Sequence, residues 1–129
     1  MRFGYTILYV RDVARALDFY ERGFGFGRGY VEEAGTYAEL DTGGTLLALV
    51  QDEQAESHLP GGFRRSSPDE PPPGIEIAFV TDDVEGAYAR AVEAGAMIVA
   101  EPEAKPWGQT VGYLRDLDGV LIELCTEPE

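Results

Sequence analysis

Two glutamates stand in stretches of sequence that are otherwise apolar and typical of strands. Glu76 lies in the run Ile75 to Thr81, and Glu123 lies in the run Val120 to Cys125. A carboxylate buried without a partner is costly, so each side chain faces either solvent or a polar cavity. In a shared cavity, mutual repulsion would raise one pKa and leave an acid and a base for isomerase or lyase chemistry. The same pair could instead bind a cation, including a weakly held divalent metal ion.

The two glutamates lie in the second copy of an internal repeat, Glu76 in its first predicted strand and Glu123 in its last. With an offset of 71, residues 5–13 fall on residues 76–84, and with an offset of 75, residues 44–49 fall on residues 119–124. The overlay places Tyr5 on Glu76 and Ala48 on Glu123. The chain is therefore predicted to contain two βαβββ modules related by a pseudo-twofold axis, and the matching positions favour a shared concave face.

Local patterns predict the elements of each module. Asp12 and Asp83 are expected to cap two amphipathic helices, and Asp118-Gly119 is expected to form a hairpin turn. The predicted strands, in chain order, are 3–10, 26–33, 36–41, 45–50, 75–81, 97–101, 109–115 and 120–125. These elements predict a single domain over residues 1–129, with module 1 at 1–50, a linker or arm at 51–74 and module 2 at 75–129.

The arm is rich in Pro, Gly, Ser and acidic residues. Only Leu59 and Phe63 offer apolar anchors, and a short helical turn is expected near residues 53–57. His58 is expected to be exposed to solvent. The alternative is a lid that closes over the site, with Arg64 or Arg65 binding an anionic ligand.

Composition limits the chemistry and the partners. The chain has 129 residues, 10 Lys+Arg against 24 Asp+Glu, and a net charge of −14, so nucleic acid and anionic membrane surfaces are not expected partners. One His and one Cys cannot build a two-His-one-carboxylate iron site, a three-His zinc site or an intrachain disulfide. The lone Cys125 indicates a cytoplasmic protein and is expected to be a buried strand residue. We expect neither a signal peptide nor a transmembrane segment.

Three stretches of the chain are distinctive: YTILYVRDVARALDFYERGFGF, IEIAFVTDDVEGAYARAVEAGA and YLRDLDGVLIEL. They resemble the vicinal oxygen chelate superfamily, which includes glyoxalase I, bleomycin-resistance proteins and extradiol dioxygenases. The ending Asp116-x-Asp118-Gly119-x-x-x-Glu123-Leu124 is similar to the family's DPDG-x-x-x-E-L, with Leu117 in place of Pro. The resemblance implies an α+β fold in which tandem βαβββ modules form a half-open eight-stranded barrel around a ligand cavity, usually within a homodimer.

The resemblance also bears on metal binding. Metal-using members place ligands at the positions of Tyr5, Ala48, Glu76 and Glu123, and only Glu123 keeps the family's ligand type. Ala48 has no donor atom and a neutral phenol is a poor ligand, so no metal or other cofactor is expected. Glu76 and Glu123 remain weak candidates for a divalent ion.

The segment Lys105-Pro106-Trp107-Gly108-Gln109 resembles the PWG stretch of the bleomycin-resistance branch, whose dimers sequester a cationic drug. We therefore expect a metal-free homodimer that binds and sequesters a small cationic or aromatic molecule, although Trp107 could instead pack in the core or at a dimer edge. The expected ligand-binding residues are Tyr5, Tyr9, Ala48, Glu76, Trp107, Gln109 and Glu123, and Tyr37 and Tyr113 could line the same cavity. The alternative is a lyase, isomerase or dioxygenase of this superfamily that uses Glu76 and Glu123 as catalytic acid and base or within a metal site.

Overall fold

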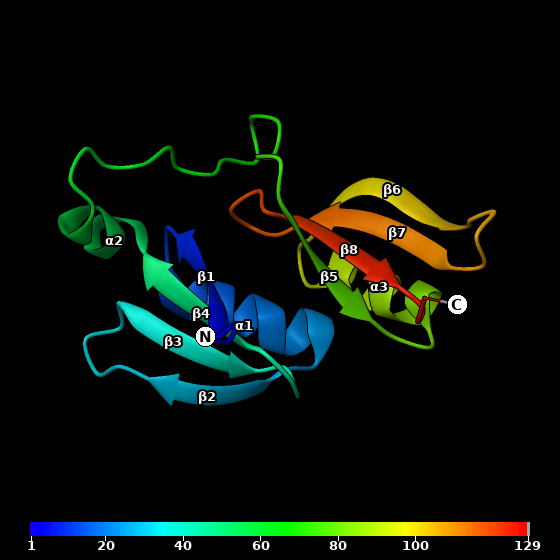
Figure 1. Ribbon diagram of the computed structural model, residues 1–129, viewed down its shortest axis with the longest axis horizontal. Helices are drawn as coiled ribbons and strands as arrows, with labels where there is room; N and C mark the ends of the chain where they lie inside the picture. The colour runs from blue at the N-terminus through cyan, green and yellow to red at the C-terminus, as the bar shows by residue number, and fades with distance from the viewer. Residues whose placement is uncertain (129) are drawn as a thin grey trace. The chain divides into compact units, whose positions relative to one another are not determined.

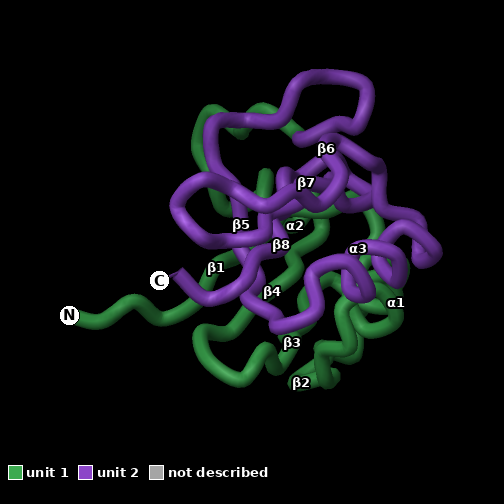
Figure 2. The backbone as a smooth tube through the Cα atoms, turned by 90° about the vertical axis from the view of Figure 1, so that its right-hand side faces the viewer, with its two compact units in different colours: residues 1–65 green, residues 66–129 purple. Residues whose placement is uncertain are grey.

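The computed structural model describes residues 1–128 and divides into two compact units, residues 1–65 and residues 66–129 (Figure 2). Residue 129, the last of the predicted second module, lies outside the described residues. Each unit contains one four-stranded sheet built by a βαβββ segment (Figure 1). The predicted α+β fold of tandem βαβββ modules is confirmed.

Unit 1 has the sheet order β1-β4-β3-β2. Strands β1 and β4 pair in parallel, and the other neighbours pair antiparallel. Its elements are β1 (Tyr5–Val10), α1 (Val13–Phe24), β2 (Gly27–Val31), β3 (Tyr37–Asp41), β4 (Leu46–Gln51) and α2 (Asp52–His58).

Unit 2 repeats this topology with the sheet order β5-β8-β7-β6. Its first and last strands, β5 and β8, again pair in parallel. Its elements are β5 (Glu76–Val80), α3 (Val84–Glu93), β6 (Met97–Ala104), β7 (Thr110–Arg115) and β8 (Leu121–Cys125).

The predicted caps explain where α1 and α3 begin. Asp12 accepts a hydrogen bond from the backbone N–H of Arg15 at 3.0 Å, and Asp83 accepts one from Gly86 at 2.9 Å. Each bond satisfies one of the N–H groups that the first turn of a helix leaves without a partner. Helix α1 ends at Gly25, whose φ of 74° gives the left-handed conformation that glycine adopts readily.

One face of each sheet packs against a helix. In unit 1, α1 contacts β3 and β4, and residues Leu8, Val10, Leu40, Leu47 and Leu49 are buried. In unit 2, α3 covers β6, β7 and β8, and Leu114, Ile122 and Leu124 are buried. Because side chains alternate along a strand, the other residues form a second face that points away from the helix, which we call the open face of each unit.

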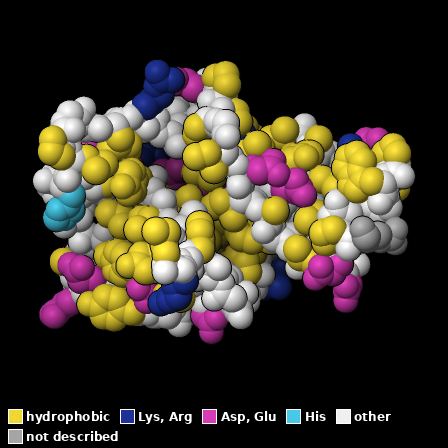
Figure 3. All heavy atoms as spheres, viewed as in Figure 1, with side chains coloured by type: hydrophobic (Ala, Val, Ile, Leu, Met, Phe, Trp, Pro, Cys, Tyr) yellow, Lys and Arg dark blue, Asp and Glu magenta, His cyan; other side chains and the backbone are white. Residues whose placement is uncertain are grey.

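The two units differ in the side chains that lie over their strands. In the space-filling view, hydrophobic side chains gather over the strands of unit 1, and acidic side chains stand among hydrophobic ones over unit 2 (Figure 3). No helix in the described part of the chain is long and apolar enough to cross a membrane.

The arm contains more regular structure than the sequence indicates. Helix α2 covers seven residues, Asp52–His58, where a single turn was predicted. Acidic residues in its first turn and His58 in its last turn complement the helix dipole, which favours the longer helix. Phe63 is one of the predicted anchors, and its ring lies 4.7 Å from that of Tyr9.

Candidate functional site

Glu123 lies at the centre of the open face of unit 2. Its Cα partners are Ala78 on β5 and Tyr113 on β7, and Glu76 pairs with Leu121, two residues before Glu123. Residues directly opposite or two apart on paired strands share a face. Strand pairing therefore brings Glu76, Tyr113 and Glu123 to one face of one sheet.

The two carboxyl groups interact directly. Hydrogen bonding with Glu123, followed by burial and by the charge of Glu123, raises the pKa of Glu76 from 4.5 to about 7. Like charges close together resist joint ionisation, so the pair retains one proton through much of the mildly acidic range. Around neutral pH this proton is available for transfer or for release when a cation binds.

The same carboxylates contribute to raised pKa values of two neighbouring groups, Tyr113 and Cys125. Burial, followed by the charges of Glu123 and Glu76, raises the pKa of Tyr113. Burial also raises the pKa of Cys125 from 9.0 to about 11, with hydrogen bonding to Glu123 as the second cause. Cys125 is buried in β8 as predicted, and its thiol stays protonated.

Arg115 is a basic residue of β7 that lies on the open face of unit 2, opposite Leu121. Its guanidinium is directed at three backbone carbonyl oxygens, those of Gly119 at 2.8 Å, Ser67 at 2.9 Å and Pro68 at 3.4 Å. Among residues 1–128, no salt bridge involves Glu76 or Glu123. The negative charge of the pair is therefore not neutralised by a cationic side chain.

Trp107 and Gln109 lie in the turn between β6 and β7, at the end of β7 opposite Arg115. The indole Nε1 donates to Gln109 Oε1 at 2.8 Å, and Gln109 Nε2 donates to the carbonyl oxygen of Thr126 at 2.8 Å. The Trp107 side chain is 61% exposed. Gln109 thus orients an exposed ring on unit 2, just past the end of β8.

Three further predicted residues lie on the open face of unit 1. Tyr5 is half exposed, Tyr9 packs on Phe63, and Ala48 is fully buried between its Cα partners Ile7 and Glu39. Since the seven predicted ligand-binding residues belong to two units, each group is described within its own unit.

The residues present do not fit the family's metal site. Of its four positions, Glu76 and Glu123 carry carboxylates, Tyr5 carries a phenol and Ala48 offers no donor atom. Among residues 1–128, no group of three or more His, Cys, Asp and Glu side chains is arranged to hold a metal ion. Two carboxylates alone are a poor match for the coordination numbers that divalent ions require.

Glu39 of β3 is a functional candidate that was not predicted from the sequence. The Tyr37 hydroxyl donates a hydrogen bond to Glu39 Oε2 at 2.6 Å, and burial together with this bond raises the pKa of Tyr37. Glu39 is the Cα partner of Ala48, so a carboxylate stands one strand away from the position that lacks one. Its alternation with Ala38 and Leu40 was the available signal, but it is equally typical of a solvent-facing strand residue.

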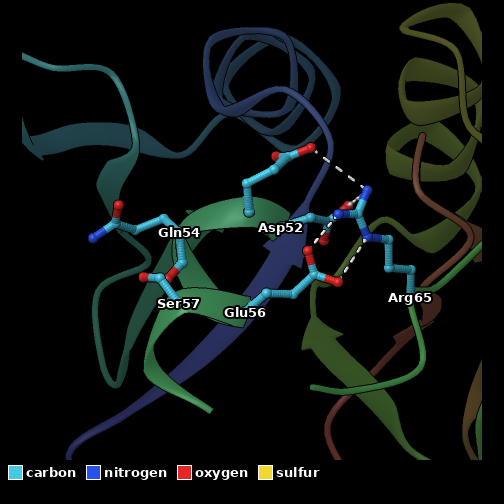
Figure 4. Close-up of polar contacts among 6 residues, drawn as sticks. Asp52, Gln54, Glu56, Ser57 and Arg65 are labelled. Atoms are coloured by element: carbon cyan, nitrogen blue, oxygen red, sulfur yellow. Dashed lines mark hydrogen bonds and ion pairs between the residues drawn. The ribbon is translucent and has the colours of Figure 1, made fainter. Parts of the chain in front are cut away.

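Two of the arm residues singled out from the sequence are associated with α2: His58 is its last residue, and Arg65 pairs with its acidic residues. Arg65 reaches Glu56 at 2.6 Å, Glu53 at 3.6 Å and the buried Asp52 at 3.9 Å (Figure 4). His58 is exposed, as expected, and its Nε2 lies 3.1 Å from the side-chain amide of Gln54. Arg65 is therefore engaged by carboxylates, which does not favour a role in binding an anionic ligand.

Comparisons with known protein families, curated proteins and solved structures indicate the same family. The family model described as Glyoxalase/Bleomycin resistance protein/Dioxygenase superfamily matches residues 2–124. The uncharacterized protein YraH of Bacillus subtilis (strain 168) is 28% identical over 118 residues, which cover 91% of each chain.

Solved structures share the fold over nearly the whole chain. A glyoxalase-related enzyme from Fulvimarina pelagi has a TM-score of 0.84 at 22% identity, covering 98% of this chain and 88% of its own. TioX from Micromonospora sp. ML1 has a TM-score of 0.73 at 27% identity, with 98% of both chains covered. A superfamily member from Sphaerobacter thermophilus has a TM-score of 0.71 at 25% identity, again with 98% of both chains covered.

Proposed function

The chain belongs to the Glyoxalase/Bleomycin resistance protein/Dioxygenase superfamily, and we propose that it is a metal-free member that binds and sequesters a small cationic or aromatic molecule at Glu76 and Glu123. The observation that carries this proposal is the interacting pair of carboxyl groups on an open sheet face, without a neutralising side chain. A ligand cation would stabilise both carboxylates in their charged form.

The surroundings of the pair support a cation over an anion. Arg115 is the nearest basic residue on β7, and it is already bound to three backbone carbonyl oxygens. Tyr113 adds an aromatic ring beside Glu123, and an aromatic face attracts cations. The second module, residues 75–129, has three basic residues against twelve acidic ones, which would also draw cations toward this unit.

The remaining predicted ligand-binding residues form part of the same proposal. Tyr5, Tyr9 and Ala48 in unit 1, and Trp107 and Gln109 in unit 2, would each contribute to ligand binding within their own unit, in a protein that acts as a homodimer. An indole ring that is 61% exposed is well suited to stack on a planar ligand.

The proposal is tested by calorimetric titration with matched cationic, neutral and anionic aromatic compounds. We expect micromolar binding of cations, about tenfold weaker binding by Glu76→Gln and by Glu123→Gln, and unchanged binding by Glu93→Gln, which alters an exposed carboxylate at the end of α3. Equal affinity for the anionic compounds would overturn the proposal. So would stoichiometric nickel, zinc or iron in the purified native protein.

A second candidate function is acid–base catalysis of an isomerase or lyase reaction. It is favoured by the Glu76 pKa of about 7, which lets one carboxyl donate a proton while its neighbour accepts one near neutral pH. Loss of turnover in both glutamine variants, with retained folding, would support this function. Turnover that is unchanged in both variants rules it out.

A further inference from the structure

A separate group of polar and aromatic side chains lies on the open face of unit 1. We call Tyr30, Tyr37 and Glu39 the Glu39 cluster. The Tyr37 hydroxyl donates to Glu39 at 2.6 Å, and the rings of Tyr30 and Tyr37 lie 6.3 Å apart with a 45° tilt. The cluster is built entirely from β2 and β3.

A β-bulge brings Tyr30 to this face. Arg28 pairs with Leu40 and Val31 pairs with Ala38, so Gly29 and Tyr30 together stand opposite the single residue Glu39. In a regular ladder Tyr30 would pair with Ala38, whose side chain is buried on the side of α1. The extra residue turns the Tyr30 ring to the opposite face, beside Tyr37.

Gly29 makes this bulge possible. A Cβ atom at Gly29 would lie 3.1 Å from the backbone oxygen of Glu39 and 3.4 Å from its Cβ. The contact with the backbone oxygen is tighter than an ordinary van der Waals contact, so a larger residue at Gly29 would require β2 and Glu39 to move apart by a few tenths of an ångström. The absence of a side chain there permits a close approach of the two strands.

The charge of Glu39 has no cationic partner in the described part of unit 1. Arg28 is next to the bulge, but it pairs with Glu21 of α1 at 2.6 Å, on the other side of the sheet. Two other arginines of this unit are likewise paired elsewhere, Arg22 with Asp18 and Arg65 with acidic residues of α2. The carboxylate is thus held by a phenol and flanked by a tyrosine ring that is 60% exposed.

We propose that the Glu39 cluster is a binding site for a small organic cation, a quaternary or substituted ammonium group, held between the Glu39 carboxylate and the rings of Tyr30 and Tyr37. An aromatic face attracts a cation within about 6 Å of the ring centre, and a weakly hydrated ammonium is desolvated more easily than a metal ion. A single carboxylate with two phenols supplies too few charged oxygens for a divalent ion. The Glu39 cluster shares the open face of unit 1 with Tyr5, Tyr9 and Ala48, and Ala48 is the Cα partner of Glu39. It goes beyond the function proposed above because its carboxylate and both of its rings are different from the groups named there, and because it involves neither Glu76 nor Glu123.

The site is tested with tetramethylammonium, using tert-butanol as a neutral probe of similar shape. Titrations followed by the ring resonances of Tyr30 and Tyr37 should show saturable shifts with the cation and none with the alcohol. We expect Glu39→Gln to weaken binding at least tenfold and Tyr30→Leu, which alters an exposed side chain, to weaken it several-fold. Glu33→Gln, an exposed acidic residue between β2 and β3, serves as the matched control and should bind normally.

Three outcomes would overturn the site: equal shifts with both probes, shifts that do not saturate, or unchanged affinity in Glu39→Gln. If Glu39→Gln does not fold, the Tyr30→Leu variant decides, and normal affinity in that variant likewise overturns the site. The variants Glu76→Gln and Glu123→Gln separate the two proposals, because we expect both to retain binding at the Glu39 cluster. Loss of these shifts in either variant would show that the cation does not bind at the Glu39 cluster.

Discussion

The Nε of Arg115 donates a hydrogen bond to the carbonyl oxygen of Gly119 at 2.8 Å, which ties the last residue of β7 to the turn that leads into β8. The same guanidinium also holds Ser67 and Pro68, in the segment that leads to β5. One buried side chain of β7 therefore holds both the turn before β8 and the segment before β5. We expect the geometry of the carboxylate pair to depend on these contacts.

Gly119→Ala should destabilise the protein by about 3 kcal/mol or more, measured by chemical unfolding. Gly119 has a φ of 90°, and a Cβ there would lie 2.7 Å from Arg115 and from the backbone of Ser67. Gly43 has the same φ of 90° but has open space around it, so Gly43→Ala should cost only about 1 kcal/mol. Equal losses in the two variants would show that the contact with Ser67 and Arg115 is unimportant.

Arg115→Lys should loosen the segment before β5. A lysine ammonium cannot reproduce the planar fork that binds three carbonyl oxygens, although it keeps the charge. We expect faster hydrogen exchange at Asp69 and Glu70 and weaker cation binding at Glu76 and Glu123. The exposed Arg15→Lys is the control, and exchange rates that match between the two variants would contradict this role of Arg115.

Glu76 should make the protein less stable as the pH rises. Its pKa is about 7 in the folded chain against an ordinary value of 4.5, so between these values the folded state binds more protons than the unfolded state. The free energy of unfolding contributed by this group is therefore constant below pH 4.5 and falls as the pH rises from 4.5 through 7. Glu76→Gln should gain stability relative to the native protein across this window, whereas Glu93→Gln should not. If the free energy of unfolding changes with pH in the same way in all three proteins, the prediction is wrong.

Cys125 should react slowly with iodoacetamide in the folded protein. Its pKa of about 11 leaves only about a thousandth of the thiol ionised at pH 8, and its burial limits access. Glu123→Gln removes the second cause of the raised pKa and should accelerate alkylation, while Glu93→Gln should leave the rate unchanged. If Cys125 of Glu123→Gln reacts at the native rate, the Glu123 carboxylate does not raise the pKa of the thiol.

Trp107 is the single tryptophan of the chain, so its fluorescence reports on one turn. With 61% of its side chain exposed, it should be quenched efficiently by acrylamide. A cationic aromatic ligand that stacks on the ring should protect it from quenching and shift its emission. Gln109→Ala removes the acceptor that orients the indole and should reduce this protection. A bound ligand that changes neither signal would exclude Trp107 from the site.

The parts of the fold that depend on local pattern were predictable. Asp12 and Asp83 begin helices because their side chains accept the first N–H groups, and this signal is contained in a few residues. Glu76 and Glu123 were found because a carboxylate inside an apolar strand is costly, and the repeat placed them in the first and last strands of the second module. Their hydrogen bond depends on strand register, which composition does not determine.

The Glu39 cluster escaped prediction for a different reason. The overlay of the two modules aligned their first and last strands, but Tyr30 and Glu39 lie on the strands between. A bulge also leaves little trace in the sequence, since Gly29 looks like any flexible residue near a turn. Helix α2 was underestimated because its composition is that of a linker, although its charges match the helix dipole.

The bulge at Gly29 and Tyr30 makes this surface sensitive to chain length as well as to residue type. Loss of Gly29, the result of a three-nucleotide deletion, would restore a regular ladder in which Tyr30 stands directly opposite Glu39. Every neighbouring residue could stay the same, yet the position of the Tyr30 ring relative to Tyr37 and Glu39 would change. The shape of this face therefore depends on a single inserted residue, whatever side chains surround it.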